Sequence, residues 1–200
     1  MHVRCFVLTF AFVSQLTTSP ETPARDLAIF RTVIQQQILH EVRTRDGNPA
    51  GRWLVVFDRT FPLCDAALKI WCMPSDVRER LELWLAQTDA DVSVVREFVS
   101  RNRAAVVVDN PDPEAALLVA SGPLETLGLS DDFWSTFHKQ YPGVKGWVRF
   151  SAPAYSDATG DAVVYVSYAC GGLCGKGWLI RLSPVGLGWR IANSILVAES

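Results

Sequence analysis

The sequence predicts an α+β fold, in which a helix-rich N-terminal part packs on a C-terminal antiparallel four-stranded β-meander. Apolar residues recur at helical spacing through most of the chain, whereas residues 141–200 consist of β-rich runs separated by turn residues. The chain has 200 residues, 49% of them hydrophobic, and a net charge of −2, which is typical of one folded domain. Helices followed by strands are typical of the α+β class.

The N-terminal part begins with its clearest helix, over residues 25–45. Its apolar side chains form one stripe along the helix, and the turn Asp46-Gly47-Asn48-Pro49 ends it. The pattern then predicts a strand at 51–58, a loop or short helix at 61–74, helices at 75–87, 91–101 and 130–140, and two strands at 104–108 and 115–120 that flank a proline-rich turn.

The C-terminal part contains four strand-like runs, at residues 147–152, 162–169, 177–182 and 189–197. The connectors between them are short. Because a parallel crossover needs a dozen or more residues, neighbouring strands are expected to run antiparallel.

The first 19 residues have the order of a secretory signal peptide. Arg4 supplies a positive start, residues 5–13 are almost wholly apolar, and a small polar stretch precedes Pro20. The apolar run is shorter than the roughly 20 residues that span a membrane, and an ordinary buried helix or strand is the alternative interpretation. We expect cleavage between Gln15 and Pro20, which leaves residues 20–200 as a single exported α+β domain, periplasmic or secreted, without a transmembrane segment.

Four cysteines remain after that cleavage: Cys64, Cys72, Cys170 and Cys174. An even number in an exported chain indicates disulfides, because the compartment is oxidising. Three connectivities are possible, and the most local one, Cys64–Cys72 with Cys170–Cys174, is favoured. A four-cysteine metal site is the alternative, but the spacings do not match the usual zinc motifs. We therefore predict no metal and no cofactor.

The C-terminal motifs resemble a group of proteins. They are Tyr141-Pro142-Gly143, Gly146-Trp147-Val148 with Phe150-Ser151, the run AVVYV at 162–166, C-G-G-L-C-G-x-G from Cys170, and a closing G-W-R-I. Over about residues 141–200 this pattern resembles the C-terminal part of small exported bacterial proteins that have no assigned function. The resemblance implies an exported meander and no catalytic residue.

The segment 170–177 is the candidate contact loop. It resembles a phosphate loop, but Cys170 stands where the first glycine is needed and Gly177 where Ser or Thr is needed. Its glycines suit a tight connection, and their backbone amides beside a lysine could contact an anion or a peptide. The candidate contact residues are Gly171, Gly172, Leu173, Gly175 and Lys176.

Catalytic patterns are incomplete. His40-Glu41 begins a zinc-protease motif that fails at Thr44. His138 could act as a general base for Ser135 or Ser151, but no G-x-S-x-G motif supports a serine hydrolase. The loop residues Asp157, Thr159 and Asp161 could bind Ca²⁺ or could form ordinary turns.

Three functions from different classes remain open. The preferred one is an exported non-catalytic domain that contacts a protein partner or the cell envelope. The alternatives are an exported hydrolase with an unmarked active site, and an inhibitor or immunity-type protein that presents the 170–177 hairpin. The near-neutral charge argues against nucleic-acid binding, and the oligomeric state stays open.

Overall fold

The computed structural model describes residues 23–64, 72–88, 91–121 and 132–199. The predicted signal segment 1–19 lies outside these ranges. The chain runs through α1 (Ala24–Val33), η1 (Ile34–Ile38), α2 (Leu39–Asp46), β1 (Leu54–Phe57), α3 (Val77–Ala86), α4 (Val94–Arg101), β2 (Ala116–Val119), α6 (Phe133–Gln140), β3 (Trp147–Phe150), β4 (Ala154–Tyr155), β5 (Ala162–Gly171), β6 (Cys174–Val185) and β7 (Gly188–Glu199).

The predicted helix 25–45 is present as one continuous helix formed by α1, η1 and α2. Its middle segment η1 is a π-helix, in which the turn is wider than an α-helical turn and contains one more residue. Two glutamines of that turn bind other parts of the fold. The amide of Gln35 donates to the Asp112 carboxylate at 3.2 Å, and the carbonyl of Gln36 accepts the backbone N–H of Ile191 at 3.2 Å. Gly47 then ends the helix with a positive φ of 77°, which favours glycine because other residues carry a Cβ.

The sheet corrects the prediction of a separate four-stranded antiparallel meander. All seven strands form one mixed sheet in the order β2-β1-β3-β5-β6-β7, with β4 paired to β5. The neighbours β3, β5, β6 and β7 are antiparallel, but β1 is parallel to both β2 and β3. The physical reason lies in the connections, because the chain passes through α3 and α4 between β1 and β2, and through α6 between β2 and β3, which gives room for parallel crossovers.

A second prediction also fails, at residues 104–108. This segment forms only an isolated bridge between Val107 and Arg59, whereas the strand predicted at 115–120 is present as β2, at one edge of the sheet.

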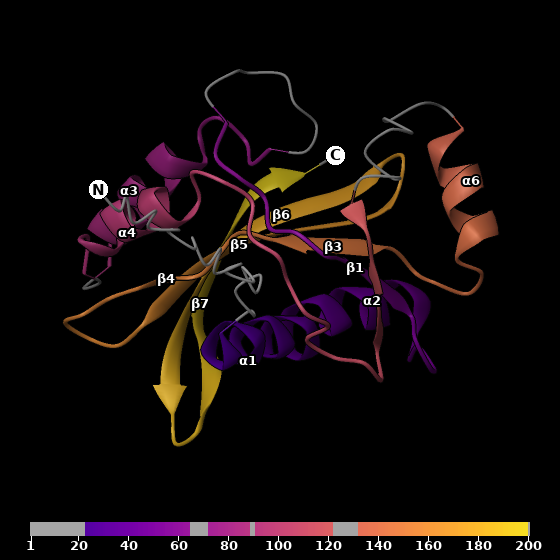
Figure 1. Ribbon diagram of the computed structural model, residues 1–200, viewed down its shortest axis with the longest axis horizontal. Helices are drawn as coiled ribbons and strands as arrows, with labels where there is room; N and C mark the ends of the chain where they lie inside the picture. Colours follow the sequence, from indigo (N-terminus) through magenta and orange to yellow (C-terminus); the bar gives the residue numbers. More distant parts are fainter. Residues whose placement is uncertain (1–22, 65–71, 89–90, 122–131, 200) are drawn as a thin grey trace, which may run out of the picture.

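Helices cover both faces of the sheet (Figure 1). Along β1, Leu54 and Val56 pack in the core beneath the α1–η1–α2 helix, whereas Val55 and Phe57 pack in the core shared with α3, α4 and α6. All four side chains are buried, so β1 is covered on both sides. The fold is therefore three layers deep around its central strands.

Gly146, just before β3, allows two backbone segments to approach closely. Its carbonyl accepts the N–H of Val55 at 3.0 Å, and a Cβ at this position would lie 2.3 Å from the backbone oxygen of Ala169. No side chain fits between these segments without a shift of the sheet.

Gly146→Ala is therefore expected to lower the free energy of unfolding by about 1–3 kcal/mol, the usual cost of overpacking. Chemical denaturation of the purified protein measures it. Gly172→Ala is the matched control, because a Cβ there meets open space. Equal stability of the two variants would contradict the close approach at β3.

Candidate functional site

The candidate contact loop lies at the tip of the β5–β6 hairpin and is closed by a disulfide. Cys170 is the penultimate residue of β5, Cys174 begins β6, and their Cα atoms are 5.2 Å apart. The other pair, Cys64–Cys72, has a Cα separation of 5.7 Å, so the structure shows the local connectivity that the sequence favours. At the turn, the Leu173 side chain is 92% exposed. We call residues 170–176 the disulfide tip.

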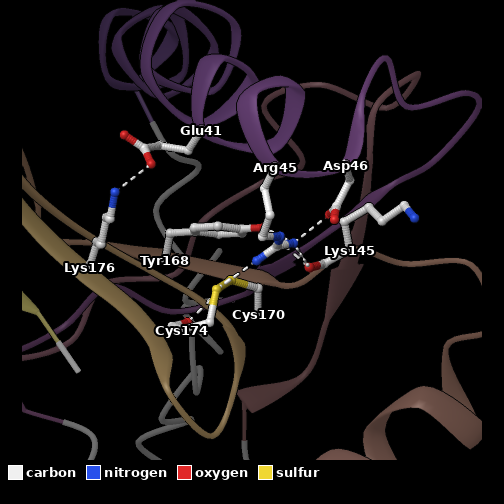
Figure 2. The surroundings of a disulfide bond; sticks show 8 residues. All are labelled: Glu41, Arg45, Asp46, Lys145, Tyr168, Cys170, Cys174 and Lys176. Atoms are coloured by element: carbon white, nitrogen blue, oxygen red, sulfur yellow. Dashed lines mark hydrogen bonds and ion pairs between the residues drawn. A yellow bond between two sulfur atoms is a disulfide. The ribbon is translucent and has the colours of Figure 1, made fainter.

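Arg45, near the end of α2, holds the disulfide tip against the helix (Figure 2). Its Nη1 donates to Cys174 Sγ. Its Nη2 donates to the Asp46 carboxylate at 2.5 Å, and to the Lys145 carbonyl and the Tyr168 hydroxyl at 3.3 Å each. The hydrogen bond from Arg45 holds the pKa of Asp46 below its usual range. The guanidinium is thus fixed on one side by oxygen atoms and faces sulfur on the other.

A second cation of the tip is also paired with α2. Lys176 Nζ lies 2.7 Å from the Glu41 carboxylate, in an ion pair that remains partly exposed. Between α2 and the disulfide tip is a hollow of about 350 Å³, lined by Glu41, Thr44, Arg45, Tyr168, Cys170, Leu173, Cys174, Gly175, Lys176 and Glu199. Of the predicted contact residues, Leu173, Gly175 and Lys176 border this hollow, whereas Gly171 ends β5 and Gly172 lies in the turn.

Tyr168 lines the hollow next to Arg45 and accepts a hydrogen bond from it. Its side chain is buried, and its hydroxyl donates to the Lys145 carbonyl at 3.1 Å. Burial raises the pKa of Tyr168, and the nearby Arg45 charge opposes part of that effect. Tyr168, Arg45 and Glu41 were not predicted as site residues. The sequence indicates both the charged end of the helix at 25–45 and the disulfide-closed hairpin. It does not indicate that they are in contact, because they are more than 120 residues apart.

The two histidines that the sequence analysis weighed for catalytic patterns lie outside the hollow. His40 is exposed on α2, and His138 is exposed on α6, which packs on the opposite face of the sheet. His138 instead contacts the ring of Trp134, with centroids 5.8 Å apart. Ser151 is buried, and its Oγ accepts the backbone N–H of Tyr165 at 2.8 Å, so this hydroxyl serves the sheet. Ser135 is exposed on α6, the helix of His138.

The loop proposed for Ca²⁺ is organised by its own hydrogen bonds. Thr159 Oγ1 accepts the backbone N–H of Asp161 at 3.2 Å, and the Asp161 carboxylate accepts the Ser183 hydroxyl at 2.7 Å. The first contact is that of an ordinary turn, and the second joins the loop to β6. Across the described ranges, no group of three or more His, Cys, Asp or Glu residues could hold a metal ion.

A scan against protein-family models finds no match to this chain, and searches of the curated proteins and of the solved structures find no similar protein. Within the part of the chain that the structure describes, every helix is too short or too polar to cross a membrane.

Alkaline pH is expected to destabilise the fold through the buried tyrosines of β5, the strand that leads to the disulfide tip. Burial raises the pKa of Tyr165 to about 12, whereas an unfolded tyrosine ionises near pH 10. Because the folded-state pKa is the higher one, the stabilisation is complete below about pH 10 and is lost as the pH rises toward 12. In that window one such group lowers the free energy of unfolding by about 1.4 kcal/mol per pH unit.

Urea unfolding at about pH 8, 10 and 11 measures this loss. Tyr165→Phe is expected to flatten the pH dependence, because the variant has no hydroxyl to ionise at that position. A slope as steep as that of the unaltered protein would show that Tyr165 is not the group concerned.

Proposed function

We propose that this chain is an exported, non-catalytic domain that binds a protein partner of the cell envelope through its disulfide tip. One observation carries the proposal: the Leu173 side chain is 92% exposed on a turn that a disulfide closes and that Arg45 ties to α2. The disulfide holds this apolar side chain in an exposed position that a partner's surface could cover.

Binding energetics favour such an arrangement. A protein that orders a loop on binding loses affinity to conformational entropy, and a loop that is ordered beforehand avoids that loss. The turn of the tip has few conformations because of the Cys170–Cys174 bond and the Lys176–Glu41 ion pair. Leu173 would supply the apolar centre of the contact, and the charged residues of the hollow would supply its polar rim.

The same observation favours a second candidate, the inhibitor or immunity-type protein. A rigid turn with one projecting leucine could enter a pocket on a partner enzyme. The two candidates differ in their outcome for the partner, because only an inhibitor lowers the partner's catalytic activity when the complex forms.

Export is supported by the two disulfides, since such bonds persist in oxidising compartments, and by the signal-like order of residues 1–19. Intact-mass spectrometry of the protein from its own host is expected to show a chain that begins between Gln15 and Pro20. A product that retains Met1 would refute cleavage and remove the main support for export.

Leu173→Asp is expected to weaken capture of an envelope partner by about tenfold or more, the effect of a lost interface hot spot. Quantitative pull-down from the host's envelope fraction, followed by titration of the captured protein, measures the change. Leu187→Asp is the matched control. Leu187 is fully exposed too, but it lies in the β6–β7 turn, at the other end of β6 from Leu173.

Capture that both variants retain, or that both lose equally, would argue against the disulfide tip as the contact surface. An activity assay on the captured protein then separates the two candidates. If the partner is an enzyme that the unaltered protein inhibits and Leu173→Asp does not, the inhibitor interpretation holds.

A further inference from the structure

The two sulfur atoms of the disulfide tip have different surroundings. Cys174 Sγ accepts a hydrogen bond from Arg45 Nη1, whereas Cys170 Sγ lies 3.2 Å from the backbone carbonyl oxygen of Cys174. Both cysteines are partly exposed, and both border the hollow of about 350 Å³. One sulfur therefore faces a cation and the other faces an acceptor of hydrogen bonds.

This asymmetry matters for thiol chemistry. A thiolate is stabilised by a neighbouring cation, and a guanidinium is always charged in proteins. Asp46 offsets part of the charge of Arg45, but it binds Nη2, and the nitrogen that faces the sulfur is Nη1. In a reduced tip, Cys174 would be favoured as the thiolate. The Cys170 thiol could keep its proton and donate it to the Cys174 carbonyl.

We propose that the Cys170–Cys174 bond is a thiol-exchange site, in which Cys174 is the leaving thiolate and Arg45 stabilises it. An incoming thiolate enters the hollow and attacks Cys170 Sγ. A bond forms between its sulfur and Cys170 Sγ while the Cys170–Cys174 bond breaks, and the electron pair moves to Cys174 Sγ. A second thiolate then attacks the sulfur of the first one, and a bond forms between these two sulfurs while the bond to Cys170 Sγ breaks. Cys170 leaves as a thiolate and takes a proton from water. Two thiols are oxidised to one disulfide, and the tip is reduced to two thiols.

The substrate is defined by its chemistry as a thiol, from a small molecule or from a protein. The step needs no partner that recognises Leu173, so it can succeed or fail independently of the proposed partner binding. It goes beyond a structural role, because it gives the guanidinium directed at Cys174 a part in the chemistry as well as in holding the disulfide tip against α2.

The first experiment measures the thiolate directly. In Cys170→Ser protein, the rate at which iodoacetamide alkylates Cys174 is followed against pH, with peptide mapping by mass spectrometry to identify the labelled cysteine. In Cys174→Ser protein, the same is done for Cys170. Cys174 is expected to react at the lower pH. Adding Arg45→Gln is expected to move its profile upward by about one pH unit, the usual effect of losing an adjacent opposite charge.

Two control substitutions keep this result interpretable. Arg45→Lys retains the charge and is expected to restore most of the profile. Arg43→Gln removes a cation that is exposed on the same helix and does not line the hollow, so it is expected to leave the profile unchanged. If Arg45→Gln leaves the Cys174 profile where it was, or if Cys170 reacts at the lower pH, the assignment of Cys174 and Arg45 is overturned.

The second experiment measures exchange in the unaltered disulfide. The protein is incubated with glutathione in one arm and with a peptide that carries one cysteine in the other, and samples are quenched with acid and mapped. The Cys170–Cys174 bond is expected to open before Cys64–Cys72, and Arg45→Gln is expected to slow its opening by about threefold, because a poorer thiolate leaves more slowly.

The two arms distinguish the source of the thiol. Faster opening with glutathione supports a small-molecule substrate, and faster opening with the peptide supports a protein substrate. If both disulfides open at the same rate in both arms, and Arg45→Gln changes neither rate, the disulfide tip is structural and the proposal fails.

Discussion

The burial of β1 on both faces is the constraint on which the rest of the structure depends. Its four side chains are at most 1% exposed, so the strand needs an apolar layer above it and another below. One layer is the α1–η1–α2 helix, and the other is formed by α3, α4 and α6. Because the first of these helices is fixed across the sheet, its C-terminal end comes to lie over the β5–β6 hairpin (Figure 2).

The candidate site is assembled from segments that are distant in the sequence. Arg45 and Cys174 are 129 residues apart, and Glu41 and Lys176 are 135 residues apart, yet each pair is in direct contact. Neither contact is worth much alone, since partly exposed ion pairs contribute little to stability. Their value lies in position, because together they fix the orientation of a turn that would otherwise move about its two strands.

The local features of this fold could be predicted from the sequence, and the long-range ones could not. Periodicity located the helix at residues 25–45, and alternation with short connectors located the four C-terminal strands. The pairing of β1 could not be found in this way. The run Leu54–Phe57 is apolar without alternation, which is typical of a parallel strand covered on both faces. The residues of this run do not indicate that β2 and β3 are the strands with which it pairs. For the same reason, the cysteine spacing favoured the local disulfide pairing, but it could not indicate that Arg45 contacts Cys174.

The π-helical turn at η1 also sets the direction in which α2 presents its side chains. An α-helix advances about 100° per residue, and a wider turn contains one residue more for the same progress along the axis. Everything after Gln37 is therefore rotated by about one residue's angle relative to an unbroken α-helix. An unbroken α-helix of the same sequence would leave the apolar stripe of α1 in place but turn Arg45 away from the sulfur it now faces, so this one wider turn decides where the charge of the surface lies.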